Sequence, residues 1–321
     1  MMLVDLLCLL FGCSTVLGTS DLFYRCYEKT ITEYSDIESG NATKLINLFN
    51  YESLPVTFYI HGWRESCTNE SSLTIVSALL SLNTGGHICC FDWSTISKHD
   101  YVSAAIKVPE VGNVLGRDMA SISDMGLAID KRWFIGFSMG AHVAGCAGQY
   151  LIETNHDRPT RITGLDPALP LFYPPFSVEN SCRLNSSQSH LVDVIHTDGG
   201  VYGVSDPIGT CDFFPNSGVR YQKNCPWLPN PFDISGILPT YRCSHDRSWM
   251  YMVEAIRNKS SHLAVQCNNA EDFYNESCSG NLIVALGSYL HVKSCSGTYY
   301  YETNGEPFYG RGEEGTYPNS P

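Results

Sequence analysis

The sequence predicts an α/β fold with a mostly parallel central sheet and helices on both faces. Short runs of β-branched and aromatic residues alternate with longer runs of helical periodicity, which is typical of strands joined by crossover helices. A turn of glycine or polar residues directly follows several of these strands. Because the carboxyl ends of parallel strands meet at one edge of a sheet, we expect the side chains in these turns to lie together there.

The predicted strands lie at residues 22–32, 55–60, 87–91, 132–136, 161–165 and 191–195, and closing strands fall within 282–303. Helical periodicity predicts helices at residues 69–82, 103–130, 139–151 and 246–257. Pro109 lies inside the second of these helices and is a potential break in it.

Length, composition and charge exclude several kinds of partner. A chain of 321 residues accommodates one large α/β domain or two small ones, and 43% apolar residues suffice for a substantial core. The net charge of −13 argues against nucleic acid and anionic membrane surfaces as electrostatic partners. No stretch after the N-terminal apolar run is long and apolar enough to span a bilayer, so no stable membrane anchor is expected.

The N-terminal apolar run, residues 3–17, is too short to span a bilayer and is followed by small residues suited to cleavage. We interpret residues 1–18 as a secretory signal peptide, residues 19–305 as one α/β domain and residues 306–321 as a disordered tail. The alternative for the first segment is a buried N-terminal helix, because no Lys or Arg precedes the run and Asp5 lies within it.

The cysteines also favour secretion into an oxidising compartment. Of the 14 cysteines, Cys8 and Cys13 lie in the predicted signal peptide, which leaves an even set of 12. None of them shows the C-x-x-C spacing of a zinc site. Cys146, on the helix at 139–151, is a candidate for a buried free thiol. Sequons for glycosylation, which also suit secretion, begin at Asn41, Asn69, Asn185, Asn258 and Asn275.

A nucleophile elbow is predicted at Gly136-x-Ser138-x-Gly140, between a strand and a helix of small residues. Such a turn is strained, and backbone atoms crowd the residues two positions either side of the serine, where only glycine avoids a Cβ clash. The turn lifts the Ser138 hydroxyl above the sheet edge. The alternative is a glycine-rich turn before an ordinary helix, so the interpretation depends on partners for the serine.

Candidate partners follow later in the chain, in the order Ser, Asp, His that α/β-hydrolases use. A serine hydroxyl needs a base, usually a histidine that a buried carboxylate orients. Asp166 ends the strand at 161–165, although an Asp before Pro is also a common turn residue. His190, His196 and His245 are possible bases. His196 is equally consistent with a core residue, whereas His245 is expected in a loop just before a helix, where a base is held in place.

Ester cleavage also needs backbone N–H donors for the oxyanion that forms in the transition state. One donor is expected from Met139, directly after the serine, and a second from Trp63, in the turn after the strand at 55–60. The alternative for this second position is that Gly62 only makes a turn.

The apolar segment between Cys225 and Cys243 is predicted to be a lid over an apolar cleft, because the two cysteines tether it beside a candidate base. The alternative is a surface loop whose apolar side packs on the core. The apolar residues of the segment are Trp227, Leu228, Phe232, Ile234, Ile237 and Leu238.

Together these segments resemble the pancreatic lipase family of secreted α/β-hydrolases, over about residues 22–304 and in the family's order. The resemblance implies that Ser138 is the nucleophile, Asp166 the orienting acid and His245 the base, with oxyanion amides from Trp63 and Met139. The matching motifs lie at residues 59–63, 91–93, 135–142, 162–168, 192–198, 212–216 and 243–247.

The resemblance also implies that Cys225 and Cys243 form the lid disulfide and that His196 and Asp198 are structural. The loop between Asp198 and Asp212 is shorter than in the pancreatic triacylglycerol lipases and resembles the phospholipase A1 branch, which includes secreted insect and venom enzymes. The length of the lid segment favours the triacylglycerol lipases instead.

The family implies a secreted serine carboxylic-ester hydrolase that acts on glycerolipids at a membrane, micelle or droplet surface, with phospholipase A1 activity favoured over triacylglycerol hydrolysis. The alternative from another class is a non-catalytic protein for storage or lipid binding. Yolk proteins of flies resemble the family but lack the catalytic serine, which is present here. No bound metal is expected, because the resemblance implies that the family's acidic calcium ligands are replaced by Asn180, Asn185 and Gln188, and the serine mechanism requires no cofactor.

Overall fold

The computed structural model describes residues 21–49, 55–83, 86–127, 132–174, 177, 182–226, 237–287 and 295–318, and for residues 237–241 it describes the backbone only. The strands in this part of the chain are β1 (Phe23–Tyr27), β2 (Tyr34–Glu38), β3 (Val56–Ile60), β4 (His87–Asp92), β5 (Arg132–Phe137), β6 (Arg161–Leu165), β7 (Leu191–Ile195), β8 (Cys211–Pro215), β9 (Leu263–Gln266), β10 (Ile283–Ala285) and β11 (Gly297–Tyr301).

Within the described residues, all eleven strands form one sheet in the order β10-β9-β11-β8-β7-β6-β5-β3-β4-β1-β2. From β11 through β8, β7, β6, β5 and β3 to β4 the strands run parallel. Only the strands at the two ends of the sheet pair antiparallel among those described. The predicted α/β class with a mostly parallel sheet is therefore confirmed.

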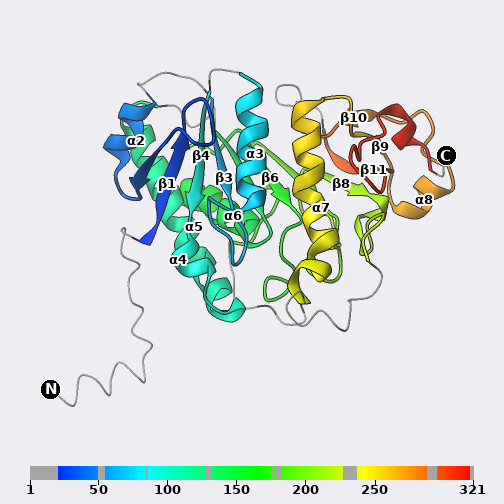
Figure 1. Ribbon diagram of the computed structural model, residues 1–321, viewed down its shortest axis with the longest axis horizontal. Helices are drawn as coiled ribbons and strands as arrows, with labels where there is room; N and C mark the ends of the chain where they lie inside the picture. The colour runs from blue at the N-terminus through cyan, green and yellow to red at the C-terminus, as the bar shows by residue number, and fades with distance from the viewer. Residues whose placement is uncertain are drawn as a thin grey trace, which may run out of the picture.

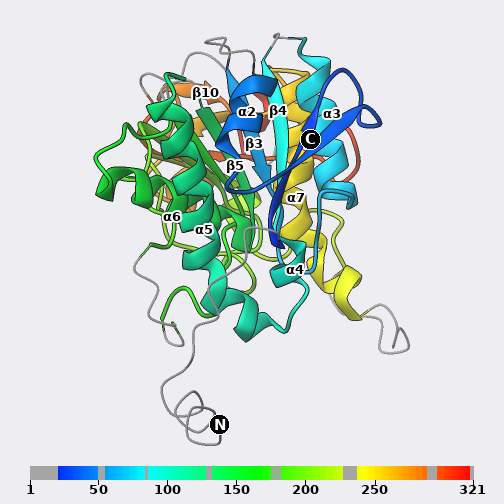
Figure 2. The same ribbon diagram turned by 90° about the vertical axis from the view of Figure 1, so that its left-hand side faces the viewer.

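The helices cover both faces of the sheet, as the two views at right angles show (Figures 1 and 2). Helices α3 and α7 lie on one face, and α2, α5 and α6 lie on the other. Their bounds are α2 (Ala42–Leu48), α3 (Glu70–Ser81), α4 (Ser94–Ser97), α5 (Tyr101–Asp124), α6 (Met139–Glu153), α7 (Ile237–Arg257) and α8 (Ala270–Tyr274), and the short 3-10 turns are η3 (Asn216–Gly218) and η4 (Glu313–Thr316). None of the helices in the described part of the chain is long and apolar enough to cross a membrane.

The core is divided into two apolar layers by the sheet. Alternate residues of a strand enter opposite layers: Phe58 of β3 and Phe134 of β5 join the cluster under α5 and α6, whereas Tyr59 and Ile135 join the one under α7. Because both faces of the central strands are buried, β3 and β5 consist mostly of apolar residues and show no regular polar alternation. This is why the central strands were the clearest feature of the sequence.

Helix α5 is continuous through Pro109, so the potential break did not occur. A proline inside a helix costs about 3 kcal/mol or more, which close packing of α5 on α6 offsets. A Cβ on Gly112 would lie 2.3 Å from Cys146 Cβ, and one on Gly116 would lie 2.7 Å from Tyr150 Cβ. The two glycines thus allow the helices to approach closely.

Two further expectations about the chain were wrong. Helix α7 begins at Ile237 and not at residue 246. The tail expected to be disordered from residue 306 is ordered through residue 318, since Tyr309 is buried and its ring packs against Tyr251. Glu254 accepts hydrogen bonds from the backbone N–H groups of Tyr309 and Gly310, which holds this segment on α7.

The cysteines of the described residues pair completely, which overturns the expectation of a free thiol at Cys146. That residue bonds to Cys182, which lies 36 residues further along the chain. Sequence spacing gave no sign of this pairing, because it depends on how the segment after β6 folds back onto α6. The pairs are Cys26–Cys89, Cys67–Cys90, Cys146–Cys182, Cys211–Cys295, Cys225–Cys243 and Cys267–Cys278.

Candidate active site

The turn between β5 and α6 has the strained geometry of a nucleophile elbow. Ser138 adopts φ 55° and ψ −120°, a conformation that costs a non-glycine residue about 1–3 kcal/mol. A Cβ on Gly136 would lie 2.4 Å from Gly140 O, and a Cβ on Gly140 would lie 2.3 Å from Ile60 O. Both glycines are therefore required for the turn to fit between its own helix and the end of β3.

The elbow is hydrogen-bonded to the turn that follows β6. Ser138 N donates to Leu165 O at 2.9 Å, and Ala168 N donates to Ser138 O at 3.3 Å. Asp166 lies between these two partners in sequence. The serine and this carboxylate are thus carried by two turns that hold each other in place.

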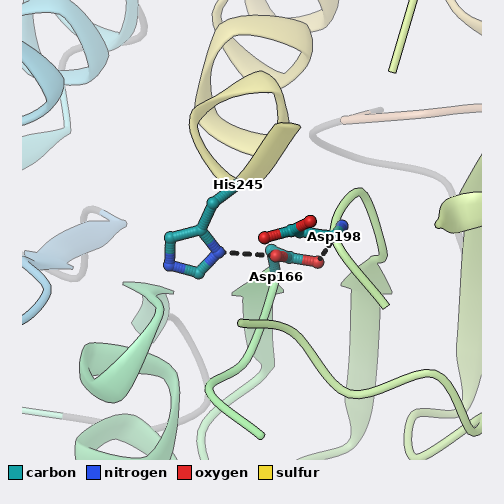
Figure 3. Close-up of side chains that lie close together, drawn as sticks. All are labelled: Asp166, Asp198 and His245. Carbon is teal, nitrogen blue, oxygen red and sulfur yellow. Dashed lines mark hydrogen bonds and ion pairs between the residues drawn. The ribbon is translucent and has the colours of Figure 1, made fainter. Parts of the chain in front are cut away.

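Asp166 and His245 face each other at the end of β6, where the histidine projects from α7 (Figure 3). His245 Nδ1 lies 2.6 Å from Asp166 Oδ2. Asp166 is fully buried, and only 5% of His245 is exposed. Since a carboxylate accepts hydrogen bonds, Nδ1 carries the proton in this pair and Nε2 is left with a free lone pair.

The second oxygen of the Asp166 carboxylate is held by the turn after β7. Thr197 N and Asp198 N donate to Asp166 Oδ1 at 2.7 Å and 3.0 Å. A Cβ on Gly203 would lie 2.3 Å from the same oxygen, so a glycine is needed behind the carboxylate. These contacts fix the direction in which Asp166 presents its other oxygen to the imidazole.

His245 lies inside α7, not in the loop expected from the sequence. Pro239 occupies the first turn of α7, where its missing N–H costs no intrahelical hydrogen bond. The rings of Phe137 and Tyr202 flank the imidazole, with centroids at 4.7 Å and 5.7 Å. A helix and two aromatic rings therefore restrain the His245 side chain.

The other two candidate bases lie elsewhere. His196 is fully buried, and its ring nitrogens contact Val204 O at 2.8 Å and Asp212 Oδ1 at 2.9 Å. His190 is exposed and precedes β7, whereas the turn that binds Asp166 follows that strand. Of the three histidines, only His245 contacts Asp166 within the part of the chain that the structure describes.

The turn that contains Trp63 passes directly beside the serine. A Cβ on Gly62 would lie only 3.2 Å from Ser138 Cβ. Neither Trp63 N nor Met139 N donates a hydrogen bond to another described residue. Both N–H groups therefore remain available to an oxygen bound next to Ser138, which is the arrangement that an oxyanion hole requires.

His61 stabilises this turn through hydrogen bonds. Its Nδ1 contacts Gly62 O at 2.9 Å, and its Nε2 accepts a hydrogen bond from Trp93 N at 3.2 Å. The indole N–H of Trp93 donates in turn to His61 O at 2.8 Å. Since Nε2 accepts, Nδ1 is the protonated nitrogen and donates to the carbonyl.

A cavity of about 300 Å³ opens over the serine and the histidine. Aromatic and apolar groups form most of its wall, with Ser138, His245 and Arg242 as the polar side chains. An apolar cavity with few convergent polar groups is typical of small-molecule sites. Sequence reasoning missed the wall residues Tyr101, Phe137, Pro170, Tyr202 and Arg242, because the fold brings them together from separate elements.

Another cavity, of about 480 Å³, lies at the opposite end of the sheet, next to the first residues of β4. Tyr27, Leu48, Leu79 and His87 are among its walls. It lies far from the elbow, since Ser138 sits at the carboxyl end of the parallel strands. We therefore assign it no part in the candidate site.

Most residues of the expected lid lie outside the described residues, so the lid stays a prediction. The structure contains the Cys225–Cys243 disulfide at the base of this segment. Ile237 and Leu238 belong to the first turn of α7, of which only the backbone is described. The residues outside the description are Trp227, Leu228, Phe232 and Ile234.

Asp198 places a second buried carboxylate beside the Asp166–His245 pair (Figure 3). Burial raises the pKa of Asp198, although Arg220 opposes this effect by donating to both of its oxygens, at 2.6 Å and 2.5 Å. The two carboxylates and the imidazole lie close enough together to hold a metal ion. However, protein donors already occupy these oxygens, so the cluster is accounted for by its hydrogen bonds.

Gln188 hydrogen-bonds the backbone of the segment where calcium ligands were expected to be replaced. Gln188 Nε2 donates to Cys182 O and Arg183 O, both at 3.1 Å, and its Oε1 accepts from Asn185 N at 2.9 Å. The two carbonyl oxygens are thus hydrogen-bonded to a side-chain donor. Asn180 lies outside the described residues.

Comparison with known proteins identifies the family of the chain. A family model described as Lipase matches residues 22–306. Lipase member H of Rattus norvegicus is 32% identical over 252 residues, which are 77% of this chain and 51% of that protein. The pancreatic triacylglycerol lipase of Myocastor coypus is 34% identical over 235 residues, which are 69% of this chain and 49% of that protein.

The fold and the elbow define the chain as an α/β-hydrolase. The matched region covers most of it, and the chain belongs to the pancreatic lipase family. It spans about half the length of the curated relatives it matches. Among solved structures, an α/β-hydrolase from a Medee basin deep-sea metagenome library is 17% identical with a TM-score of 0.34, over 60% of this chain and 70% of that chain.

Proposed function

We propose that this protein is a secreted serine carboxylic-ester hydrolase that acts on acyl esters of glycerolipids. The observation that carries the proposal is the 2.6 Å contact between His245 Nδ1 and Asp166 Oδ2 at a cavity that Ser138 also lines. Nucleophile, base and orienting acid come from three separate elements that meet at one edge of the sheet. This combination is the one that acyl transfer through a serine requires.

In the first half of the reaction, Ser138 Oγ attacks the carbonyl carbon of the ester while His245 Nε2 accepts the hydroxyl proton. Asp166 stabilises the imidazolium that forms and keeps the ring in the tautomer with Nδ1 protonated. The tetrahedral intermediate then collapses, and His245 transfers the proton to the alcohol that leaves. Water repeats the same steps on the acyl-enzyme and releases the fatty acid.

The oxyanion of each tetrahedral intermediate accepts hydrogen bonds from Trp63 N and Met139 N. The support for this role is that both N–H groups lack an acceptor among the described residues and lie beside the serine. Removing one such donor typically costs about 100- to 1,000-fold in kcat. Because both donors belong to the backbone, side-chain substitutions test them only indirectly.

An extracellular location is supported by the six disulfides of the described residues, which persist in oxidising compartments. Family membership supports a lipid substrate. The apolar wall of the cavity suits an acyl chain, and we expect the enzyme to work at a membrane, micelle or droplet surface.

Within this class we propose phospholipase A1 activity, on the ground of the short loop between Asp198 and Asp212. Triacylglycerol hydrolysis is the second candidate, because a pancreatic triacylglycerol lipase is among the similar relatives, at 34% identity. A binding role without catalysis is disfavoured, because Ser138 and both elbow glycines are present.

The test compares the purified full chain with Ser138→Ala on phosphatidylcholine vesicles and on a triacylglycerol emulsion, each with position-labelled acyl chains. Release of the sn-1 chain from the phospholipid, abolished by the substitution, is the expected result. Cleavage of triacylglycerol alone would assign the protein to the second candidate. Absence of Ser138-dependent hydrolysis on both lipids would favour a binding role.

A further inference from the structure

Glu65 is a buried carboxylate next to the turn that contains Gly62 and Trp63, and it has no role in the mechanism above. Only 4% of it is exposed. Its Oε2 accepts hydrogen bonds from Gly62 N at 3.2 Å and from Ser71 Oγ on α3 at 3.0 Å. The carboxylate therefore binds the N–H of the His61–Gly62 peptide, one peptide unit before the N–H of Trp63, and links it to a helix.

The other oxygen of Glu65 binds an arginine from α7. Arg242 Nη2 donates to Glu65 Oε1 at 2.7 Å and to Asp246 Oδ1 at 2.9 Å. Glu65 and Arg242 are 177 residues apart in sequence. Since α3 and α7 lie on the same face of the sheet (Figures 1 and 2), this contact ties the turn after β3 to the helix that carries His245.

The position of Arg242 makes the contact relevant to catalysis. Arg242 and Asp246 lie one turn apart on α7, with His245 between them in sequence, and the guanidinium carbon is 5.7 Å from the centre of the Phe137 ring. Phe137 directly precedes Ser138 and packs against the imidazole. Arg242 itself lines the cavity over the serine. The Glu65–Arg242 ion pair thus lies where the Gly62–Trp63 turn, the elbow and His245 meet.

We propose that Glu65 is a positioning residue. Together with Arg242, it fixes the position of the Gly62–Trp63 turn relative to His245, as transition-state stabilisation requires. Glu65 acts through the backbone: by binding the N–H of Gly62 it fixes the His61–Gly62 peptide, and this restricts the direction of the next N–H group, that of Trp63. This proposal rests on the function proposed above and identifies the side chains that set the geometry of the proposed oxyanion hole.

The chemistry of the contacts requires a carboxylate at position 65. Glu65 accepts from Gly62 N, Ser71 Oγ and Arg242 Nη2, and it donates none of these bonds. A glutamine has one acceptor oxygen and one NH₂ group. Whichever way its amide turns, a donor faces either Gly62 N or the arginine, so Glu65→Gln conserves shape but disrupts one side of the network.

The test measures kcat and KM of Glu65→Gln on a short soluble ester, p-nitrophenyl butyrate. With this substrate, binding to a lipid surface does not affect the measured rate. We expect kcat to fall about 10- to 100-fold with KM within about threefold, because a misplacement near 1 Å costs up to about 100-fold in rate. The inhibition constant of an alkyl trifluoromethyl ketone, which forms an oxyanion on the serine, should rise by a similar factor. Glu70→Gln, at an exposed glutamate in the first turn of α3, is the matched control.

A second variant keeps the test decisive if Glu65→Gln does not fold. Arg242→Met removes the partner on α7 and should give the same pattern of lower kcat and weaker ketone binding. In the double variant, kcat should fall by less than the two single effects combined. The reason is that the Arg242 guanidinium, which would face the NH₂ group of the glutamine, is absent. A fall in Tm with kcat and ketone binding unchanged would overturn the proposal and leave Glu65 a structural role.

The outcomes of the two proposals are distinguishable. If Ser138→Ala leaves ester hydrolysis intact, the proposed function fails. If Ser138→Ala abolishes hydrolysis while Glu65→Gln and Arg242→Met remain within twofold of the unmodified protein, only the positioning role fails.

Discussion

At the scale of single residues, hydrogen bonds hold the side chains of the candidate site in fixed orientations. Asp166 adopts a positive φ of 43° and is held by two backbone N–H groups on one oxygen and by the imidazole on the other. Its role in the proposed mechanism depends on this orientation, because the carboxylate decides which imidazole nitrogen is protonated. A substitution that keeps the shape of the side chain but replaces one acceptor oxygen with a donor tests the orienting role without leaving a cavity.

We expect Asp166→Asn to lower kcat on p-nitrophenyl butyrate by about 1,000- to 10,000-fold, because the amide stabilises the wrong imidazole tautomer. The asparagine oxygen still accepts from Thr197 N and Asp198 N, so the variant should fold. Asp124→Asn, at a carboxylate that is 73% exposed, is the control. Activity of Asp166→Asn within tenfold of the unmodified protein would exclude Asp166 as the orienting acid.

His142 gives a prediction about stability. It is fully buried on α6, where its Nε2 contacts Ala168 O at 2.8 Å and its Nδ1 accepts from Leu184 N at 3.2 Å. Burial lowers the pKa of His142 from 6.5 to about 4. The unfolded chain therefore binds a proton at a higher pH than the folded protein does, and stability falls as the pH drops from about 6.5 to about 4.

The expected loss over this window is about 3 kcal/mol, at 1.36 kcal/mol for each pKa unit. Urea unfolding at several pH values between 7 and 4.5 measures it. His142→Gln, which retains a donor and an acceptor, should remove most of this pH dependence, whereas His190→Gln at an exposed site should not. An equal slope in His142→Gln and the unmodified protein would show that other groups cause the loss.

At the scale of elements, the elbow depends on how closely α6 can approach its neighbours. Gly112 of α5 faces Cys146 of α6, and the same cysteine is bonded to Cys182. Helix α6, which begins directly after Ser138, is therefore held by α5 on one side and by a disulfide on the other. Changes at this contact should affect stability more than chemistry.

Gly112→Ala is expected to destabilise the protein by about 1–3 kcal/mol, because its Cβ would lie 2.3 Å from Cys146 Cβ and cannot be accommodated without shifts. The measurement is the urea midpoint, with Asn113→Ala at an exposed position of the same helix as the control. A midpoint for Gly112→Ala at or above that of the unmodified protein would contradict the packing described here.

The elements that the sequence revealed were those buried on both faces. Strands β3, β5, β6 and β7 were predicted within one or two residues, because β-branched and aromatic residues recur in them. Strands β8 and β9 were missed: one ends in proline and the other has four residues, so neither has a clear pattern. The start of α7 was also missed, since the helix begins at Ile237, inside the segment expected to form the lid.

The candidate site was predictable only in part, for a related reason. Ser138, Asp166 and Trp63 each follow a strand directly, so their common edge follows from the order of the chain. Glu65 and Arg242 have no such signal, since a contact between residues 177 positions apart is visible only after the sheet and helices are assembled.

At the scale of the whole molecule, the turns after β3, β5, β6 and β7 meet at one edge of the sheet, and α7 brings the base to them from one face (Figure 1). Two of the disulfides hold elements that lie near this edge. One bonds the turn near Trp63 to β4 through Cys67 and Cys90, and another bonds Cys225 to Cys243 beside His245.

Peptide mapping under non-reducing conditions tests this arrangement. The peptide with Cys146 should be found linked to the one with Cys182 and to no other. An alkylated, unpaired Cys146 in the native protein would contradict the way the segment after β6 folds back onto α6.

The central claim is that His245 and Asp166 activate Ser138 as the nucleophile. The most direct measurement is reaction of the full chain with diethyl p-nitrophenyl phosphate in mixed micelles, with the released nitrophenolate quantified and the adduct located by mass spectrometry. We expect one equivalent of nitrophenolate and a single diethylphosphoryl group on Ser138, with the reaction lost in Ser138→Ala and slowed by more than about 1,000-fold in His245→Gln. An adduct on another residue, or equal rates with and without His245, would contradict the account.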